Sequence, residues 1–206
     1  MESGDNITAL GNSSSVHGKL QCSAKTKDQR ILVNINCGSM GSDLPPAIGA
    51  CIAAGKDVVC FTGDGSLMMN LQELATIKHN KLPVKLIVFS NNGYDAIRQT
   101  CKNYFEGKDF GCSPDSGLSF PKFKQLAEAF DFPYKLCPNT GELENSIKWI
   151  MAQDSFAFLE VLQKFDNPTL PRLMSRLQPD GTFERATLED MYPFLDKEEL
   201  KNLMFI

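Results

Sequence analysis

Apolar and polar residues alternate in blocks along the chain, and these blocks predict strands and helices in turn. Short, continuous apolar runs rich in β-branched residues are typical of strands that are covered on both faces of a sheet. The strands predicted in this way lie at 7–10, 31–35, 57–61, 84–89, 132–136 and 156–161. Three of these runs are followed directly by glycine, asparagine or serine, which are usual residues of turns: Gly11, Asn36 and Ser90.

Segments whose apolar residues recur at intervals of three and four predict helices between these strands. The predicted helices lie at 45–54, 68–81, 123–130, 142–151 and 197–204. Prolines in the first turn of the first helix, and Gly55 just after its end, match the usual start and stop signals. The alternation predicts an α/β fold, a three-layer α/β/α sandwich around a mostly parallel central sheet.

Two segments break this rhythm. Residues 102–119 are polar, charged and contain glycine, and a loop of this length in a compact domain is usually a functional lid or disordered. Residues 167–206 contain several prolines and a turn at Pro179-Asp180-Gly181. We therefore expect a main domain at 1–166 and a C-terminal extension at 167–206, which wraps the surface, contacts a neighbour or is loosely ordered at its end.

Composition narrows the class of protein. The 206 residues are 42% hydrophobic and carry a formal net charge of −4, which fits one substantial core. The sequence has no basic block, so we expect no nucleic-acid partner and no charge-driven membrane partner. It has no apolar run of about 18 residues that would span a membrane, and its first residues do not resemble a secretion signal.

The chain has seven cysteines, and none of them forms a C-x-x-C motif. An odd, irregular set of cysteines favours a reducing compartment, so we expect a cytoplasmic protein without a disulfide framework. For the same reason we do not expect a zinc site.

Two polar motifs follow neighbouring predicted strands. Gly63-Asp64-Gly65-Ser66 comes after the strand at 57–61, and Asn91-Asn92 comes after the strand at 84–89. Parallel strands joined by a helix end at the same edge of a sheet, so these motifs should face one crevice. Carboxylate and amide oxygens suit Mg²⁺, and the backbone N–H groups of a glycine-rich turn suit phosphate. The sequence therefore predicts a metal-bridged diphosphate site.

The pair Gly63-Asp64-Gly65-Ser66 and Asn91-Asn92 resembles the signature of thiamine diphosphate (ThDP) enzymes. A lone Gly-Asp-Gly is often only a turn, whereas two unrelated turns at this spacing would be a coincidence. The resemblance implies that Asp64, Asn92 and the backbone carbonyl of Tyr94 bind Mg²⁺. It also implies that the backbone of Gly63, Gly65 and Ser66, with the Ser66 hydroxyl, holds the diphosphate. Asn91 is interpreted as a turn residue.

A second segment supports the same resemblance. Gly38-Ser39-Met40-Gly41, followed by the helix at 45–54, is similar to the segment that cups the cofactor in acetolactate synthase-like ThDP enzymes. The resemblance implies that Met40 wedges between the two cofactor rings and that the Gly38 carbonyl accepts from the aminopyrimidine. Asn12 and Ser13 occupy the position of a second diphosphate loop, but this match is positional only.

The resemblance implies one half of a ThDP- and Mg²⁺-dependent enzyme that decarboxylates a 2-oxo acid such as pyruvate and transfers the product to an acceptor carbonyl. In that family the activating glutamate lies on a pyrimidine-binding domain, and no such domain is recognised in these residues. We therefore expect no catalytic residue here, little activity alone, and a pyrimidine-binding domain or subunit as partner in a homo- or hetero-oligomer. Two alternatives are a noncatalytic cofactor-binding or regulatory module and an unrelated Mg²⁺-dependent phosphate-handling protein.

Overall fold

The computed structural model describes residues 7–13, 27–164 and 170–204, together with Val16, Gly18 and Leu20. The chain divides into two compact units, Met1–Asn167 and Pro168–Ile206.

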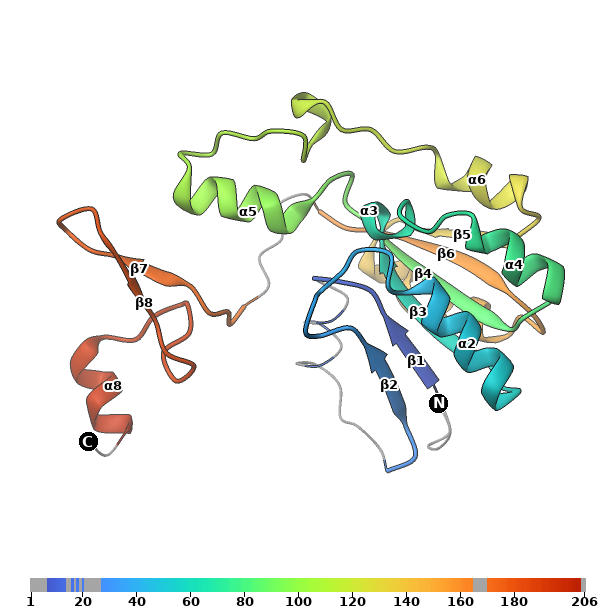
Figure 1. Ribbon diagram of the computed structural model, residues 1–206, viewed down its shortest axis with the longest axis horizontal. Helices are drawn as coiled ribbons and strands as arrows, with labels where there is room; N and C mark the ends of the chain where they lie inside the picture. Colours follow the sequence, from blue (N-terminus) through green and yellow to red (C-terminus); the bar gives the residue numbers. More distant parts are fainter. Residues whose placement is uncertain are drawn as a thin grey trace. The chain divides into compact units, whose positions relative to one another are not determined.

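The first unit is built on a six-stranded sheet in which every strand pair is parallel (Figure 1). Its strands are β1 (Ile7–Leu10), β2 (Arg30–Val33), β3 (Val58–Gly63), β4 (Val84–Ser90), β5 (Tyr134–Cys137) and β6 (Ala157–Leu162). They lie in the order β2-β1-β3-β4-β6-β5. The central strands β1, β3, β4 and β6 are largely buried, which explains their continuous apolar runs. The predicted parallel α/β fold is confirmed.

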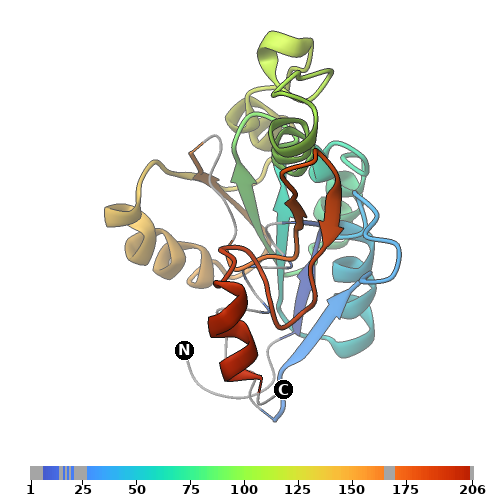
Figure 2. The same ribbon diagram turned by 90° about the vertical axis from the view of Figure 1, so that its left-hand side faces the viewer.

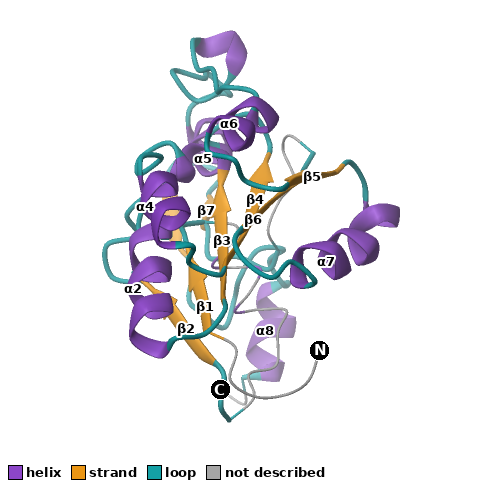
Figure 3. Ribbon diagram, turned by 90° about the vertical axis from the view of Figure 1, so that its right-hand side faces the viewer, coloured by secondary structure: helices purple, strands orange, loops and turns teal. Residues whose placement is uncertain are grey.

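Helices cover both faces of this sheet (Figure 3). They are α2 (Leu44–Ala54), α3 (Asp64–Leu67), α4 (Glu73–Asn80), α5 (Asp95–Tyr104), α6 (Phe123–Ala129) and α7 (Leu143–Met151). Residues of α2, α4 and α6 pack on one face in the larger core cluster, and Ile150 of α7 packs on the other face. The sandwich buries both faces of the sheet and leaves the ends of its strands open for a site.

Two predicted segments differ from the structure. The helix predicted at 68–81 is shorter in the structure, where α4 begins only at Glu73. The chain turns at 68–72, and the Asn70 side chain there donates a hydrogen bond to the Gly41 carbonyl at 2.7 Å. The segment 102–119, predicted as a loop, begins inside helix α5 and contains a short 3₁₀ helix at Pro114–Ser116. Helix α5 escaped prediction because its buried residues are Arg98 and Gln99 rather than an apolar stripe.

A buried lysine lies beside the smaller core cluster, since Lys85 pairs in register with Val59 and Ala157 of that cluster. Lys85 in β4 is completely buried, although its neighbours in the strand are apolar. Its ammonium group donates to the backbone carbonyls of Gln153 and Ser155 and lies 3.5 Å from Asp57 Oδ2. A buried charge is tolerated only when it is paired and hydrogen-bonded, as here. Lys85 therefore ties β4 to the connection between α7 and β6.

Replacing Lys85 with methionine is expected to lower the free energy of unfolding by about 3 kcal/mol, because the Gln153 and Ser155 carbonyls would lose their donor. Urea unfolding followed by circular dichroism measures the change. The matched control is Lys148→Met, in which an exposed lysine loses only its contact with Glu144 one turn away, so a small change is expected. Equal midpoints for the two variants would contradict the role assigned to Lys85.

The second unit contains an antiparallel hairpin and a helix (Figure 2). Strands β7 (Ser175–Leu177) and β8 (Phe183–Arg185) are joined by the turn that contains Gly181, whose φ is +83°. Helix α8 (Lys197–Leu203) follows. The helix was predicted at this place and the turn at Gly181 was recognised, but the flanking strands are too short for a clear alternation of apolar and polar residues.

Candidate cofactor and metal site

A cavity of about 280 Å³ lies at the edge of the sheet where β3 and β4 end. It is lined by residues from the ends of these strands, from the loops after β1 and β2, and from the start of α5. The lining residues are Asn12, Ser13, Met40, Gly63, Asp64, Gly65, Ser66, Phe89, Asn91, Gly93, Tyr94, Asp95, Ala96, Ile97 and Gln163. Ligands of open α/β sheets bind at this carboxyl edge, so the cavity has the expected position.

Asp64 joins the two motifs. Its side chain follows β3 directly and is only 3% exposed. Its Oδ2 accepts hydrogen bonds from the backbone N–H groups of Asn91 at 2.9 Å and Asn92 at 2.7 Å, and its Oδ1 accepts from Gly65 N–H at 2.7 Å. Burial raises the pKa of Asp64, and these N–H donors oppose that rise. The structure thus brings positions 64 and 92 together.

The contact at position 92 is made by the backbone. Asn92 has a left-handed φ of +59°, its side chain is exposed, and it is not among the residues that line the cavity. Asn91 does line the cavity, and its side-chain oxygen accepts from Gly93 N–H at 3.1 Å, as in a turn. The assignment of the Asn92 amide oxygen to a metal stays a prediction, which requires the side chain to turn inward.

Met40 and Tyr94 meet above Gly65. A Cβ atom on Gly65 would lie 2.2 Å from Tyr94 Cε1 and 3.2 Å from Met40 Cε, so no larger residue fits there without displacing them. Tyr94 also contacts the ring of Phe120 edge to face, with ring centroids 6.0 Å apart. The cavity therefore has a thioether and an aromatic ring on one wall, and both belong to residues predicted for the site.

The two loops after β1 and β2 lie next to each other. A Cβ atom on Gly38 would stand 3.6 Å from Asn12 Oδ1, and Gly38 has a φ of +55°, which favours glycine. Asn12 and Ser13 line the cavity, whereas Gly38 and Ser39 are not among its lining residues. The roles predicted for Gly38 and Ser39 toward a cofactor thus stay predictions, and of the two residues Gly38 lies beside Asn12.

A buried carboxylate behind the cavity was not predicted as functional. Asp43 was interpreted as part of a turn-rich stretch, yet it is completely buried. Its Oδ2 accepts from the hydroxyls of Thr62 and Ser66, both at 2.5 Å, and its Oδ1 accepts from Leu44 N–H at 2.8 Å, which caps α2. A Cβ on Gly11 would come within 2.8 Å of Asp43 Oδ2, so this arrangement also needs a glycine after β1.

Through Ser66, the Asp43 carboxylate is linked to the loop that carries Met40. The Ser66 hydroxyl donates to Asp43 and accepts from Gly41 N–H at 2.8 Å. Since its only proton is directed at Asp43, the predicted bond from this hydroxyl to a phosphate would require the bond to Asp43 to break. That role stays a prediction, and the observed role of Ser66 is to join the loop at 38–41 to the turn at 63–66.

The charged side chains in the cavity wall are acidic. Among the described residues that line it, the charged side chains are Asp64 and Asp95, and neither lysine nor arginine is present. Asp95 is paired with Arg98 at 3.3 Å, so a diphosphate in this cavity would face the Asp64 carboxylate without a counter-charge from the lining side chains. A divalent cation between the carboxylate and the phosphates removes this conflict, since hard cations bind both kinds of oxygen.

Several lining residues were not predicted as part of the site. They are Phe89, Asn91, Gly93, Asp95, Ala96, Ile97 and Gln163. Phe89 and Gln163 lie at the ends of β4 and β6, so the rule that ligands bind beyond the carboxyl ends of parallel strands could have indicated them. Asp95, Ala96 and Ile97 begin α5, which the apolar pattern did not reveal.

The fold and this site define an α/β protein with an oxygen-rich ligand site at the carboxyl edge of a parallel sheet. Residues 10–161 match the family model described as "Thiamine pyrophosphate enzyme, C-terminal TPP binding domain". The chain therefore belongs to the thiamine pyrophosphate enzyme family and corresponds to its C-terminal cofactor-binding domain; thiamine pyrophosphate is another name for ThDP. None of the helices in the described part of the chain is long and apolar enough to cross a membrane.

Individual relatives agree with this membership. The chain is 32% identical to the acetolactate synthase isozyme 2 large subunit of Escherichia coli (strain K12). The match extends over 139 residues, which are 67% of the chain and 25% of that protein. It is 34% identical to the acetolactate synthase large subunit of Porphyra purpurea, over 125 residues that make up 60% of the chain and 21% of that protein. The chain thus spans about a quarter of the length of these relatives.

Proposed function

We propose that this chain holds the diphosphate end of ThDP through a Mg²⁺ ion bound at Asp64. The single observation that carries the proposal is the buried Asp64 carboxylate, which faces a cavity at the carboxyl edge of the sheet without a lysine or arginine among its described lining residues. In this setting a divalent cation is needed before an anionic cofactor is attracted. The oxygen donors fit Mg²⁺, which prefers carboxylate, amide and carbonyl ligands.

The residues of the chain would share the binding as follows. Asp64, with the Asn92 amide oxygen and the Tyr94 carbonyl, would hold Mg²⁺, and the backbone at Gly63 and Gly65 would approach the diphosphate. Met40 would support the cofactor rings, since a polarizable thioether packs well against aromatic and sulfur-containing groups. Asn12 and Ser13 would complete the cavity wall, and Gly38 would lie behind Asn12.

The reaction we propose for the complete enzyme is decarboxylation of a 2-oxo acid such as pyruvate, followed by transfer to an acceptor carbonyl. The relatives are acetolactate synthases by name, and this supports the proposal for the present chain. When bound, ThDP supplies the thiazolium carbon that adds to the substrate and stabilises the negative charge. The chain's own residues bind and orient it, and the Asp64 carboxylate keeps the ion in place.

The activating acid would come from a pyrimidine-binding domain or subunit. Ile97 lines the cavity and is 47% exposed, and Phe105 and Phe110 on the following segment are also exposed. Apolar side chains beside a cofactor cavity fit a second domain that covers them. We therefore propose a homo- or hetero-oligomer in which that domain completes the site, in the cytoplasm.

The 206-residue chain is expected to bind ThDP in the presence of Mg²⁺ but to turn over no pyruvate by itself, because the activating acid would be missing. Calorimetry with ThDP, with and without Mg²⁺, measures the binding, and carbon dioxide release from pyruvate measures turnover. Steady turnover by the purified chain would refute the need for a second domain. Failure of millimolar ThDP to bind with Mg²⁺ present would refute the cofactor assignment itself.

A further inference from the structure

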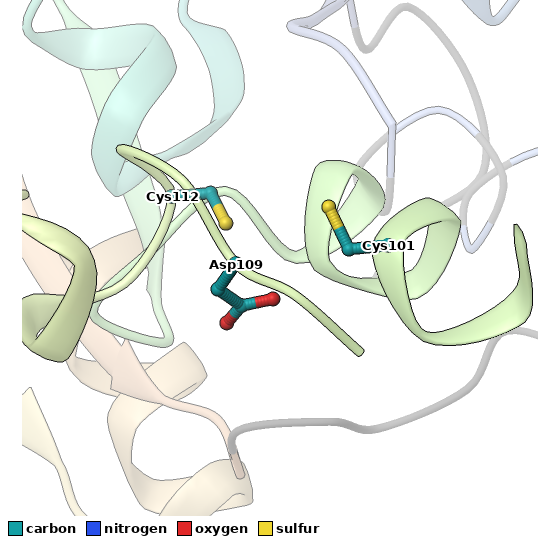
Figure 4. A group of neighbouring side chains, drawn as sticks. All are labelled: Cys101, Asp109 and Cys112. Atoms are coloured by element: carbon teal, nitrogen blue, oxygen red, sulfur yellow. The ribbon is translucent and has the colours of Figure 1, made fainter. Parts of the chain in front are cut away.

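A second group of potential metal ligands lies on helix α5 and on the segment that follows it. Cys101 on that helix, and Asp109 and Cys112 on the segment after it, have ligand atoms that all lie within 4.8 Å of one another. Figure 4 shows the two thiols and the carboxylate next to one another. Cys112 is buried, and the other two side chains are half-buried. Residues 102–108 separate Cys101 from Asp109, so the sequence gives no compact metal motif and only the fold brings the three together.

We propose that Cys101, Asp109 and Cys112 bind a thiophilic divalent ion of the Zn²⁺ type. Thiolate ligands select Zn²⁺ over Mg²⁺ and Ca²⁺, which prefer oxygen, so this site takes a different ion from the one proposed at Asp64. Two thiolates on one tetrahedral Zn²⁺ lie about 3.8 Å apart, given Zn–S bonds of about 2.3 Å. Side-chain rotations that move the ligand atoms by about 1 Å therefore bring all three to bonding distance. A water or a further donor takes the fourth position.

The ion would fix a segment that touches the cofactor cavity. The Cys112 carbonyl accepts a hydrogen bond from Tyr94 N–H at 2.9 Å, and a Cβ on Gly93 would lie 2.5 Å from the same oxygen. Helix α5, which carries Cys101, contributes Asp95 and Ile97 to the cavity wall. An ion that joins Cys101 to Cys112 would thus close the exposed loop at 105–111 against α5 and hold the backbone around Tyr94.

The proposal is tested by titrating the reduced chain with Zn²⁺ alone, without ThDP, in competition with a coloured chelator. The wild-type chain is expected to bind one Zn²⁺, and to bind it more tightly than any variant that lacks one of the three ligands. Cys101→Ser and Asp109→Asn are each expected to weaken binding at least about tenfold. The matched control is Cys37→Ser, which replaces an exposed free cysteine and should leave Zn²⁺ affinity unchanged.

A second measurement follows the loop. Lys108 is exposed and lies between the ligands Cys101 and Asp109, so trypsin should cleave after it. Zn²⁺ is expected to slow this cleavage in the wild-type chain and in Cys37→Ser, but not in Asp109→Asn. Absence of stoichiometric Zn²⁺ binding would overturn the proposal, as would unchanged affinity in both Cys101→Ser and Asp109→Asn. Because no ThDP is present, none of these results depends on the function proposed at Asp64.

Discussion

Replacing Asp64 with alanine is expected to abolish Mg²⁺-dependent binding of ThDP, with a loss of affinity of at least about 100-fold, or about 2.7 kcal/mol. The variant lacks the one carboxylate that joins the turn after β3 to the turn after β4. Calorimetry with ThDP at saturating Mg²⁺ measures the loss. Asp154→Ala is the matched control, since this aspartate is exposed and does not line the cavity.

The same carboxylate should make binding depend on pH. Burial raises the pKa of Asp64, so the proton is retained to a higher pH than in an ordinary aspartate. A metal ion needs the ionised form of Asp64. The affinity for ThDP with Mg²⁺ should therefore weaken as the pH falls through this raised pKa, and at such a pH the binding of Mg²⁺ should release a proton. The stability of the protein without ligand should change with pH in the opposite direction. Because folding raises the pKa of Asp64, the free energy of unfolding falls as the pH rises through that pKa and the carboxyl group ionises.

Two results would contradict the metal assignment at Asp64. One is an affinity for ThDP in Asp64→Ala that equals that of Asp154→Ala, with both variants folded by circular dichroism. The other is binding that is equally strong with Mg²⁺ and with a chelator that removes it. Either result would mean that the diphosphate is held by backbone N–H groups alone, as at other glycine-rich turns.

The sequence predicted the parts of the molecule whose physics is local or strongly periodic. Buried parallel strands appear as continuous apolar runs, so β3, β4 and β6 were found within about two residues of their ends. Asp64 could also be predicted, because the rule for the carboxyl ends of parallel strands places its motif opposite Asn91-Asn92. The structure brings these motifs into contact, but it makes the contact at position 92 through the backbone.

Features that depend on distant partners could not be predicted in this way. Helix α5 buries Arg98 and Gln99, and a polar inner face gives no apolar period to recognise. Cys101 and Cys112 become neighbours only after the segment between them folds back, so their spacing carried no metal motif. Asp43 in a turn-rich stretch looks like an ordinary turn residue, since its partners Thr62 and Ser66 are remote in the sequence.

Replacing Asp43 with alanine is the change we expect to have the second largest effect, with a loss of about 3 kcal/mol or more in the free energy of unfolding. The substitution would leave the buried hydroxyls of Thr62 and Ser66 without their acceptor, and hydrogen bonds to a charged group are worth about 1.5–3 kcal/mol each. It would also remove the cap of α2, which costs about 1 kcal/mol in typical cases. Urea unfolding midpoints measure the sum, which is not expected to be additive.

Two milder variants separate stability from the arrangement of the site. Asp43→Asn keeps one oxygen as acceptor for the two hydroxyls but presents an NH₂ group to Leu44 N–H, so it should lose mainly the cap. Ser66→Ala leaves the Asp43 contacts with Thr62 and Leu44, and it removes both the hydroxyl bond to Asp43 and the link to Gly41 N–H. If the link to Gly41 positions the Met40 loop, Ser66→Ala should weaken ThDP binding more than Asp43→Asn does. Its free energy of unfolding should nevertheless fall less than that of Asp43→Ala.

The comparison of these variants decides between two roles for the buried carboxylate. An Asp43 that only stabilises the fold would lower the unfolding midpoint and leave the ThDP affinity of the folded protein unchanged in Asp43→Ala and Asp43→Asn. An Asp43 that positions the site acts through Ser66, so a double-mutant cycle of Asp43→Asn and Ser66→Ala should show coupling in ThDP affinity as well as in stability. Additive effects on affinity would leave Asp43 as a helix cap and a core residue, because the loop at 38–41 would then hold its place without it.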